Sequence, residues 1–334
     1  MQRALITKGM VAGLALAGVT ATATLLPSSA IAAPKYVGRM SIEVQEGHPK
    51  HVAMEKFAKL VSERTNGEVE IKIFPNSQLG GELETAEGIR LGSIQFGAVT
   101  SSVLANWVPD VQVMDLPFIF RSEEHAIKAN TLLKSRFGSK FEAQGFHLLG
   151  FSVNGARELI STFPIEKPED VKGKKMRVIQ SPIHIDMWKA VGANPVPIPA
   201  PEIYTSLQNK VVDYFDNTTT NYYTFRFYEV AKYFTKLDHL FAMATWIVDA
   251  KWWARLPKGH QDAIEKSAGE IQPLIPELLA KNDDAALAKT VEQGAKVIIV
   301  KDKTPWQKAM APVWDQYSVK IPDGKELIAA IGAL

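Results

Sequence analysis

Residues 171–179 of this 334-residue chain read VKGKKMRVI, a charged turn that leads into a short apolar strand. Successive side chains of a strand point to opposite faces, so Met176 and Val178 should face a core and Arg177 the other side. Arg157 lies upstream, in the run NGAR at 154–157. The segment therefore predicts a sheet that holds arginines at its strand ends.

A second short strand ends downstream at Asp216 and Asn217. A guanidinium group is planar and permanently charged, and it can bind a carboxylate through two parallel hydrogen bonds. Two arginines and an amide at strand ends suggest a binding pocket for a small organic acid. Taken alone, Arg177 could instead pair with a nearby carboxylate such as Glu169, and Asn217 could be an ordinary turn residue.

The first 32 residues have the features of a cleavable export signal. Arg3 and Lys8 form a positive segment, residues 10–26 are mostly apolar, and residues 28–32 read SSAIA, a stretch suited to signal cleavage. The apolar stretch is short and interrupted by threonines, which argues against a membrane anchor. We therefore expect residues 1–32 to be a signal peptide and the mature chain to be exported.

Charge and composition exclude several classes of protein. The formal net charge is +2, and removal of Arg3 and Lys8 would leave a neutral mature chain. Such a chain is not expected to bind nucleic acid or to be attracted generally to anionic membranes. The chain has no cysteine, which excludes disulfides, thiolate metal sites and cysteine nucleophiles. A mature length of about 300 residues is compatible with two domains.

Apolar periodicity indicates strands that alternate with helices along the chain. Strands are expected at 36–44, 69–74, 95–99, 146–153 and 297–300, with a long extended run at 238–251. Helices are expected at 122–143, 259–293, 304–317 and 324–331, with a kink or break at Pro273 and Pro276. This alternation predicts an α/β fold built around mostly parallel sheets.

Enzyme and metal signatures are weak. The run at 172–175 reads KGKK and lacks the Ser or Thr of a phosphate-binding loop. His184 and Asp186 could imitate a base and its orienting group, but no nucleophile accompanies them. His48 and His51 are separated by Pro49 and have no evident third ligand, so a solvated helix start is expected rather than zinc. No cofactor and no catalytic activity are expected.

Several short segments together resemble a known family. They are QLGGE (78–82), DLPF (115–118), NGAR (154–157), KGKKMR (172–177), YTSLQ (204–208), VD (212–213) and YEVAKY (228–233). Each segment is weak alone, but their order and spacing over the whole mature chain resemble the DctP-type family. Its members are the extracytoplasmic substrate-binding proteins of TRAP (tripartite ATP-independent periplasmic) transporters.

The resemblance implies the two-domain α/β fold of periplasmic binding proteins, with a ligand cleft between the lobes and strands that cross between them. Matched to this sequence, domain I would comprise residues 33–154 and about 243–282. Domain II would comprise residues 155–242 and about 283–334. It also implies a periplasmic location and two membrane partners, one small and one large integral subunit.

The same resemblance assigns binding residues. The main carboxylate clamp of the family falls on Arg177, its second arginine on Arg157 and its pocket asparagine on Asn217. Further ligand-facing positions would be Gln45 or Glu46, Glu82, Thr100 or Ser101, and Gln180. Sialic-acid-binding relatives carry an aromatic residue where Ala200 stands, so sialic acid is not expected.

These residues give a functional hypothesis with three alternatives. Asp216, Glu46 and Glu82 offer acceptors for hydroxyl groups, so a sugar acid or other hydroxy-carboxylate is favoured as the transported anion. The alternatives are a dicarboxylate, a 2-oxo acid bridged to Asp216 and Gln180 by a cation, and an exported sugar-acid enzyme that uses His184 and Asp186.

Overall fold

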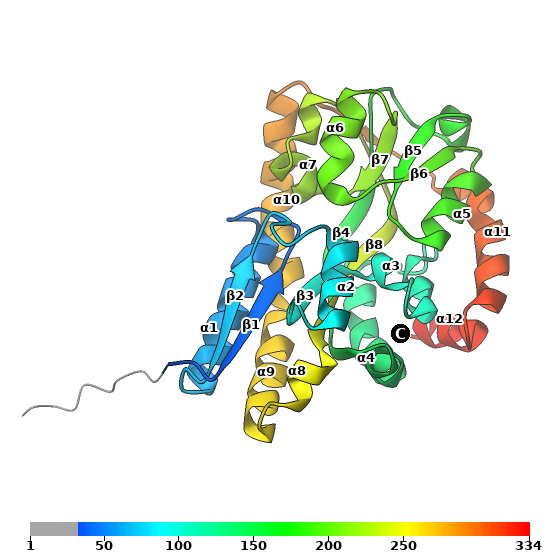
Figure 1. Cartoon of the computed structure of the whole chain (residues 1–334). Helices are drawn as coiled ribbons and strands as arrows, with labels where there is room; N and C mark the ends of the chain where they lie inside the picture. Colours follow the sequence, from blue (N-terminus) through cyan, green and yellow to red (C-terminus); the bar gives the residue numbers. More distant parts are fainter. Residues whose placement is uncertain (1–32) are drawn as a thin grey trace, which may run out of the picture. The chain divides into compact units, whose positions relative to one another are not determined.

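A nine-stranded mixed sheet runs through residues 33–334, the part of the chain that the computed structural model describes (Figure 1). The strands lie in the order β2-β1-β3-β8-β4-β7-β5-β6, and β9 pairs with β8 beside this path. The expected signal peptide, residues 1–32, lies outside the described residues.

One end of the sheet is formed by strands near the start of the described chain. These are β1 (Tyr36–Ser41), β2 (Val69–Phe74) and β3 (Phe96–Thr100), and β1 pairs in parallel with both others. The helices around them are α1 (Pro49–Arg64), α2 (Glu82–Leu91), α8 (Ala250–Ala254) and α9 (Lys258–Ile271). We call these seven elements the β1 half.

The other end is formed by β5 (Lys175–Val178), β6 (Asn194–Pro197) and β7 (Tyr214–Asn217), with β5 parallel to both others. With α5 (Pro182–Ala190), α6 (Ile203–Gln208) and α7 (Thr219–Thr224) they make up what we call the β5 half. Met176 and Val178 are fully buried in the core, and Arg177 points to the opposite face, as the alternation predicted.

Two long strands, β4 (Phe146–Ser161) and β8 (Tyr233–Asp249), run antiparallel through the middle of the sheet and belong to both halves. The expected strand at 146–153 was therefore too short, because polar residues in mid-strand interrupt the apolar pattern. The register shifts between Val153 and Ala156, where Gly155 has φ +96°. Such a bulge breaks the alternation of side chains, and it lets Asn154 and Arg157 face the same side.

The described chain also contains the short 3₁₀ helices η2 (Pro168–Val171), η3 (Ala200–Glu202) and η4 (Phe227–Glu229). The remaining elements complete the fold. They are α3 (Ser101–Leu104), the 3₁₀ helix η1 (Pro109–Asp115), α4 (Glu123–Ala143), α10 (Leu274–Glu292), β9 (Lys296–Ile299), α11 (Thr304–Lys320) and α12 (Gly324–Gly332). The expected helix at 259–293 is divided into α9 and α10 just before Pro273, as the prolines predicted. The strands within each half are parallel, whereas β3–β8, β4–β7 and β4–β8 are antiparallel.

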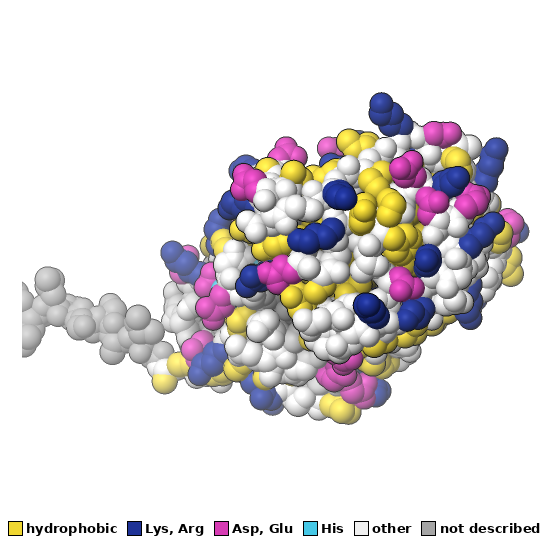
Figure 2. Space-filling view, turned by 90° about the horizontal axis from the view of Figure 1, so that it is seen from above, with side chains coloured by type: hydrophobic (Ala, Val, Ile, Leu, Met, Phe, Trp, Pro, Cys, Tyr) yellow, Lys and Arg dark blue, Asp and Glu magenta, His cyan; other side chains and the backbone are white. Residues whose placement is uncertain are grey.

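The surface carries mixed charge. On the face shown in Figure 2, Lys and Arg side chains are interspersed with Asp and Glu around smaller apolar areas. None of the helices in residues 33–334 combines the length and the apolar character that crossing a membrane requires. The domain boundaries given above stay a prediction.

Candidate functional site

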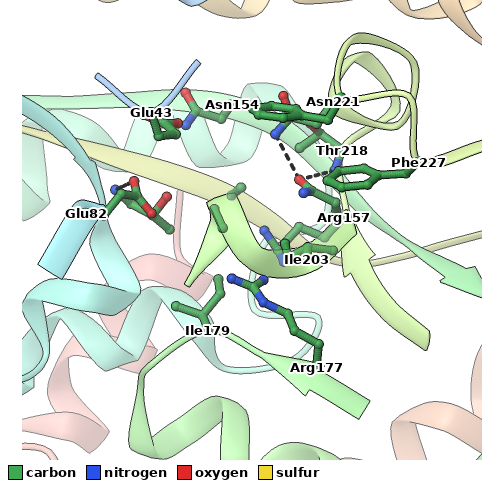
Figure 3. Close-up of a pocket in the computed structure, with 15 residues that line it drawn as sticks. Glu43, Glu82, Asn154, Arg157, Arg177, Ile179, Ile203, Thr218, Asn221 and Phe227 are labelled. Atoms are coloured by element: carbon green, nitrogen blue, oxygen red, sulfur yellow. Dashed lines mark hydrogen bonds between the residues drawn. The ribbon is translucent and has the colours of Figure 1, made fainter. Parts of the chain in front are cut away.

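A pocket lies where strand ends of the two halves meet over β4 and β8 (Figure 3). It encloses about 530 Å³ of space not filled by protein atoms, including its mouth. Its lining comprises Glu43, Glu82, Thr100, Asn154, Arg157, Arg177, Ile179, Ala200, Ile203, Asn217, Thr218, Asn221, Phe225, Phe227 and Ala242.

Arg177 is a buried cation in the pocket wall. Its side chain is held by one hydrogen bond, from Nε to the carbonyl oxygen of Ile198 at 2.7 Å, and the residue is 4% exposed. Within residues 33–334, no carboxylate oxygen lies within 4.0 Å of its guanidinium nitrogens. Burial, together with the nearby charge of Arg157, lowers the pKa of Arg177 to about 10. The group therefore remains charged at neutral pH without a counter-ion.

Arg157 differs because it is already paired. Its Nε lies 2.6 Å from Oδ2 of Asp216, and it also donates to the backbone carbonyl of that residue. Asp216 is fully buried, with Nε2 of His239 3.2 Å from the same oxygen. Burial alone would raise the pKa of Asp216, but the charge and hydrogen bond of Arg157 hold it well below its usual range. Asp216 is not among the pocket-lining residues and serves as the counter-ion of Arg157.

Asn217 presents a donor to the pocket. Its Oδ1 accepts two hydrogen bonds, from the backbone N–H of Thr218 at 2.9 Å and from Nδ2 of Asn221 at 3.0 Å. With its oxygen engaged, the amide nitrogen of Asn217 is the group left to face the pocket, where it offers two N–H donors. Arg177 and Asn217 thus present donors only.

The opposite wall carries acceptors. Figure 3 shows Glu43 and Glu82 on the side of the pocket that faces Arg157 and Arg177. Oε1 of Glu82 accepts the N–H of Thr100 at 2.6 Å, and burial with the nearby Glu43 raises the pKa of Glu82. Among the pocket-lining residues that the structure describes, Arg177 and Glu82 are the ionisable groups without an ion pair.

Lys50 compensates the second acidic group. Its Nζ donates to both carboxylate oxygens of Glu43, at 2.8 and 2.9 Å, and to the carbonyl oxygen of Ala98 at 2.7 Å. Lys50 is 1% exposed and all three of its donors are engaged. The lysine therefore supports Glu43 from behind and has no donor left for a ligand.

Besides Asp216, three of the predicted binding positions lie outside the lining. Glu46 is exposed, and the hydroxyl of Ser101 is buried against that of Thr245 at 2.8 Å, whereas the neighbouring Thr100 does line the pocket. Gln180 contributes its backbone carbonyl to Asn106 at 3.2 Å. Of the eight predicted residues, the structure thus brings together Arg157, Arg177, Asn217 and Glu82 at one pocket.

Sequence reasoning missed several lining residues, including Glu43, Asn154, Asn221, Phe225 and Phe227. The two phenylalanines belong to an aromatic cluster that reads as core, and they do also pack in an apolar cluster. Glu43 fell inside an expected strand. Its pairing with the buried Lys50 arises only in the fold, so no local pattern in the sequence distinguishes it.

The two histidines at the start of α1 are not solvated, which corrects the expectation. His48 is 5% and His51 8% exposed. Nδ1 of His48 accepts the backbone N–H of Lys50 at 3.1 Å and so caps the helix, and burial lowers the pKa of His48 to about 4. Within residues 33–334, no group of three His, Asp or Glu side chains is arranged to hold a metal ion.

His184 and Asp186 do not form a base and orienting pair. His184 is fully buried, with Nε2 3.1 Å from the hydroxyl of Ser102. Asp186 accepts instead from the hydroxyl of Tyr317 at 2.8 Å and from Gln316. The two side chains are engaged with different partners, and neither lines the pocket.

The model of bacterial extracellular solute-binding protein family 7, DctP, matches residues 40–320. The chain belongs to this family. The DctP family comprises substrate-binding proteins of transporters rather than enzymes. The chain is 30% identical over 299 residues to the 2,3-diketo-L-gulonate-binding periplasmic protein YiaO of Escherichia coli, covering 88% of this chain and 90% of that protein.

Solved structures of TRAP periplasmic solute-binding proteins share the fold. One from Xanthobacter autotrophicus, with bound β-D-galacturonate, has a TM-score of 0.84 at 32% identity and covers 89% of this chain and 99% of that chain. One from Sulfurospirillum deleyianum, with bound succinate, has a TM-score of 0.83 at 33% identity and covers 90% and 99%. The present DctP-family chain thus has the two-domain fold of periplasmic binding proteins.

Proposed function

We propose that this DctP-family protein captures an organic acid anion in the periplasm and delivers it to the small and large membrane subunits of a TRAP transporter. The observation that carries the proposal is Arg177, a buried cation that faces the pocket without a carboxylate partner in residues 33–334. A carboxylate ligand would supply the missing counter-charge. Asn217 would donate to the same carboxylate through its amide nitrogen.

The opposite wall favours one class of acid. Glu82 and Glu43 present carboxylate oxygens, which accept hydrogen bonds from hydroxyl groups. A second carboxylate placed there would meet like charge. The pocket therefore favours a sugar acid or other hydroxy-carboxylate over a dicarboxylate, although relatives of similar likeness have been solved with β-D-galacturonate and with succinate.

Two alternatives receive less support. A cation bridging a 2-oxo acid would need Asp216 and Gln180, but Asp216 is engaged by Arg157 and His239, and Gln180 is outside the lining. A sugar-acid enzyme would need His184 and Asp186 to act together, and they contact different partners. We therefore propose binding without catalysis.

The uncompensated charge also suggests how binding changes the protein. A buried guanidinium without a counter-ion is costly, which favours an open, hydrated cleft when no anion is present. An anion that contacts both walls links the β1 half to the β5 half and shifts the population toward the closed form. The closed form is the one that we expect the membrane subunits to recognise.

A thermal-shift screen tests this function. The mature protein is heated with sugar acids, hydroxy acids, 2-oxo acids and dicarboxylates, and with neutral sugars as controls. A ligand at a hundred times its Kd should stabilise the native state by about 2.7 kcal/mol. We expect the largest rise in Tm with a sugar acid such as D-galacturonate or D-glucuronate. Equal shifts with the neutral sugars, or none with any acid, would contradict the proposal.

The acceptor wall gives a prediction on selectivity. Glu82→Gln keeps an oxygen to accept the N–H of Thr100 but replaces the second carboxylate oxygen by an amide N–H₂ group, which donates and does not accept. The variant should bind D-galacturonate about tenfold more weakly, because an acceptor for a hydroxyl group is lost, and succinate about tenfold more tightly, because a donor for its second carboxylate is gained; tenfold corresponds to ~1.4 kcal/mol, within the usual range for one hydrogen bond. Calorimetry with both acids measures the two changes.

The matched control is Glu84→Gln, which removes an exposed carboxylate from the same first turn of α2. Its affinities should equal those of the wild type. Parallel weakening of both acids in Glu82→Gln would mean that Glu82 supports the pocket structurally and does not select the ligand.

A further inference from the structure

A chain of hydrogen bonds connects the start of α1 in the β1 half to Asn217 in the β5 half. The backbone N–H of Lys50 donates to Nδ1 of His48 at 3.1 Å. Nε2 of His48 lies 3.1 Å from Oδ1 of Asn221, and Nδ2 of Asn221 donates to Oδ1 of Asn217 at 3.0 Å. His48 and Asn221 both also line a small cavity that adjoins the binding pocket.

The direction of each bond in this chain is fixed by the one before it. A backbone N–H can only donate, so Nδ1 of His48 must be the acceptor. Burial lowers the pKa of His48 to about 4, so the ring is neutral near pH 7 and carries its proton on Nε2. Nε2 must then donate to the oxygen of Asn221. The amide nitrogen of Asn221 is left to donate to the oxygen of Asn217.

The end of the chain faces the pocket. Because the oxygen of Asn217 is engaged by Asn221 and by the N–H of Thr218, its amide nitrogen is directed to the ligand. A free asparagine amide can turn by 180° and present its oxygen instead, which would repel a carboxylate. We propose that His48, acting through Asn221, is a positioning residue that holds the Asn217 amide with its N–H groups toward the carboxylate of the bound acid.

This inference rests on the proposed function, because it gives Asn217 a task only if an anion occupies the pocket. The inference also links the orientation of the Asn217 amide to closure of the cleft, because His48 and Asn221 belong to opposite halves of the molecule. The bond from Thr218 to the Asn217 amide lies within the β5 half, whereas His48 can hold the second bond, from Asn221, only when the two halves are together. The acid would meet its full set of donors in the closed form alone.

A double-mutant cycle tests the proposal, with D-galacturonate, D-glucuronate and succinate as probes. His48→Ala should weaken binding of whichever probes the wild type binds, on the order of tenfold, a typical coupling for residues in one hydrogen-bond network. In an Asn217→Ala background the same change should have no further effect, since no amide remains to be oriented. If the Asn217→Ala variants bind the probe too weakly for calorimetry, their affinity is measured from thermal shifts at millimolar concentrations of the probe.

Gln45→Ala is the matched control. Nε2 of Gln45 donates to the carbonyl oxygen of Thr224 at 3.0 Å, so it also joins the two halves but does not contact Asn217. Its effect should be the same in both backgrounds. His48 also caps α1, so chemical denaturation of each variant measures its fold, and Asn221→Ala repeats the cycle if His48→Ala does not fold.

The outcomes separate this inference from the function on which it rests. If the wild type binds neither these three acids nor any other acid of the thermal-shift screen, or Arg177→Ala binds its acid normally, the proposed function is wrong. If Arg177→Ala abolishes binding but His48→Ala and Asn221→Ala have equal effects in both backgrounds, or none in either, His48 does not act through Asn217. An effect confined to the background that retains Asn217 supports the relay.

Discussion

Replacing Arg177 by alanine should weaken the binding of the preferred sugar acid by about 2–5 kcal/mol, the range for truncating one partner of a buried charge pair. This corresponds to a rise in Kd on the order of thirtyfold to several thousandfold. The reason is that Arg177 is the pocket arginine without its own carboxylate, so the carboxylate of the ligand would lose its main partner. Isothermal calorimetry measures the loss directly.

Conservative variants at Arg177 sharpen the test. Arg177→Lys should also bind poorly, because an ammonium group cannot reproduce the two parallel bonds of a guanidinium fork. Arg177→Met should bind as poorly as alanine, yet its empty form should be at least as stable as the wild type, because a buried charge without a partner is removed. A variant that loses binding but keeps or gains Tm has lost a ligand contact rather than its fold.

The matched control is Arg90→Ala, at the far end of α2 from Glu82, where an exposed arginine pairs with Glu87. It should bind normally, with a stability change within about 0.5 kcal/mol. Near wild-type affinity in both Arg177→Ala and Arg177→Met would show that the carboxylate binds elsewhere.

The sequence predicts the position of Arg177 but not its lack of a counter-ion. Strand alternation in 171–179 is enough to separate Arg177 from Met176 and Val178, because it is a local property. Whether an arginine is paired depends on what the fold brings near it. Asp170, one nearby candidate in the sequence, instead accepts the backbone N–H groups of Glu166 and Lys167.

Carboxylates were predicted at the pocket, but only one of the two that line it, Glu82, was among the predicted residues. Glu82 was assigned to the site by the family resemblance, and it does line the pocket. Glu46 and Asp216 were expected beside it, and the structure supplies Glu43 instead. The turn after β1 places Glu43, and not Glu46, at the pocket. The long-range pairing of Asp216 with Arg157 keeps Asp216 out of the lining. Neither effect can be deduced from residue spacing.

The length of β4 has a similar explanation. Its second part carries Asn154, Arg157 and Glu158, which read as the end of a strand when apolar alternation is the criterion. In the fold the side chains of Arg157 and Glu158 are satisfied by partners on β7 and β8, and Asn154 lines the pocket, so the strand continues to Ser161. A bulge at Gly155 then lets Asn154 and Arg157 face the same side, where both line the pocket. This part of the pocket thus lies where apolar alternation does not predict the strand, as is expected at functional positions.

Asp216 gives the largest expected effect on stability. Asp216→Ala should lower the free energy of unfolding by about 3–5 kcal/mol, because it leaves Arg157 buried with an uncompensated charge. His239, fully buried, would also lose the oxygen that lies 3.2 Å from its Nε2. Asp216→Asn should lose less, since its oxygen can still accept from Nε of Arg157. Denaturation in urea at pH 7 measures both variants.

The pairing of Asp216 with Arg157 also makes the stability of the fold depend on pH, in a direction that follows from the pKa of Asp216. The pKa of Asp216 is well below its usual range in the folded protein, whereas an unfolded aspartate titrates near 3.9. The folded state therefore binds fewer protons than the unfolded state, and the stabilisation is fully present above about pH 5 and is lost as the pH falls further. The difference in stability between wild type and Asp216→Ala should accordingly shrink between about pH 5 and pH 3.

Asp262→Ala, which breaks the exposed pair with Lys258, should change stability by less than about 1 kcal/mol at every pH. A gap between wild type and Asp216→Ala that stays constant with pH would mean that the loss comes from packing around residue 216 and not from the charge that it shares with Arg157.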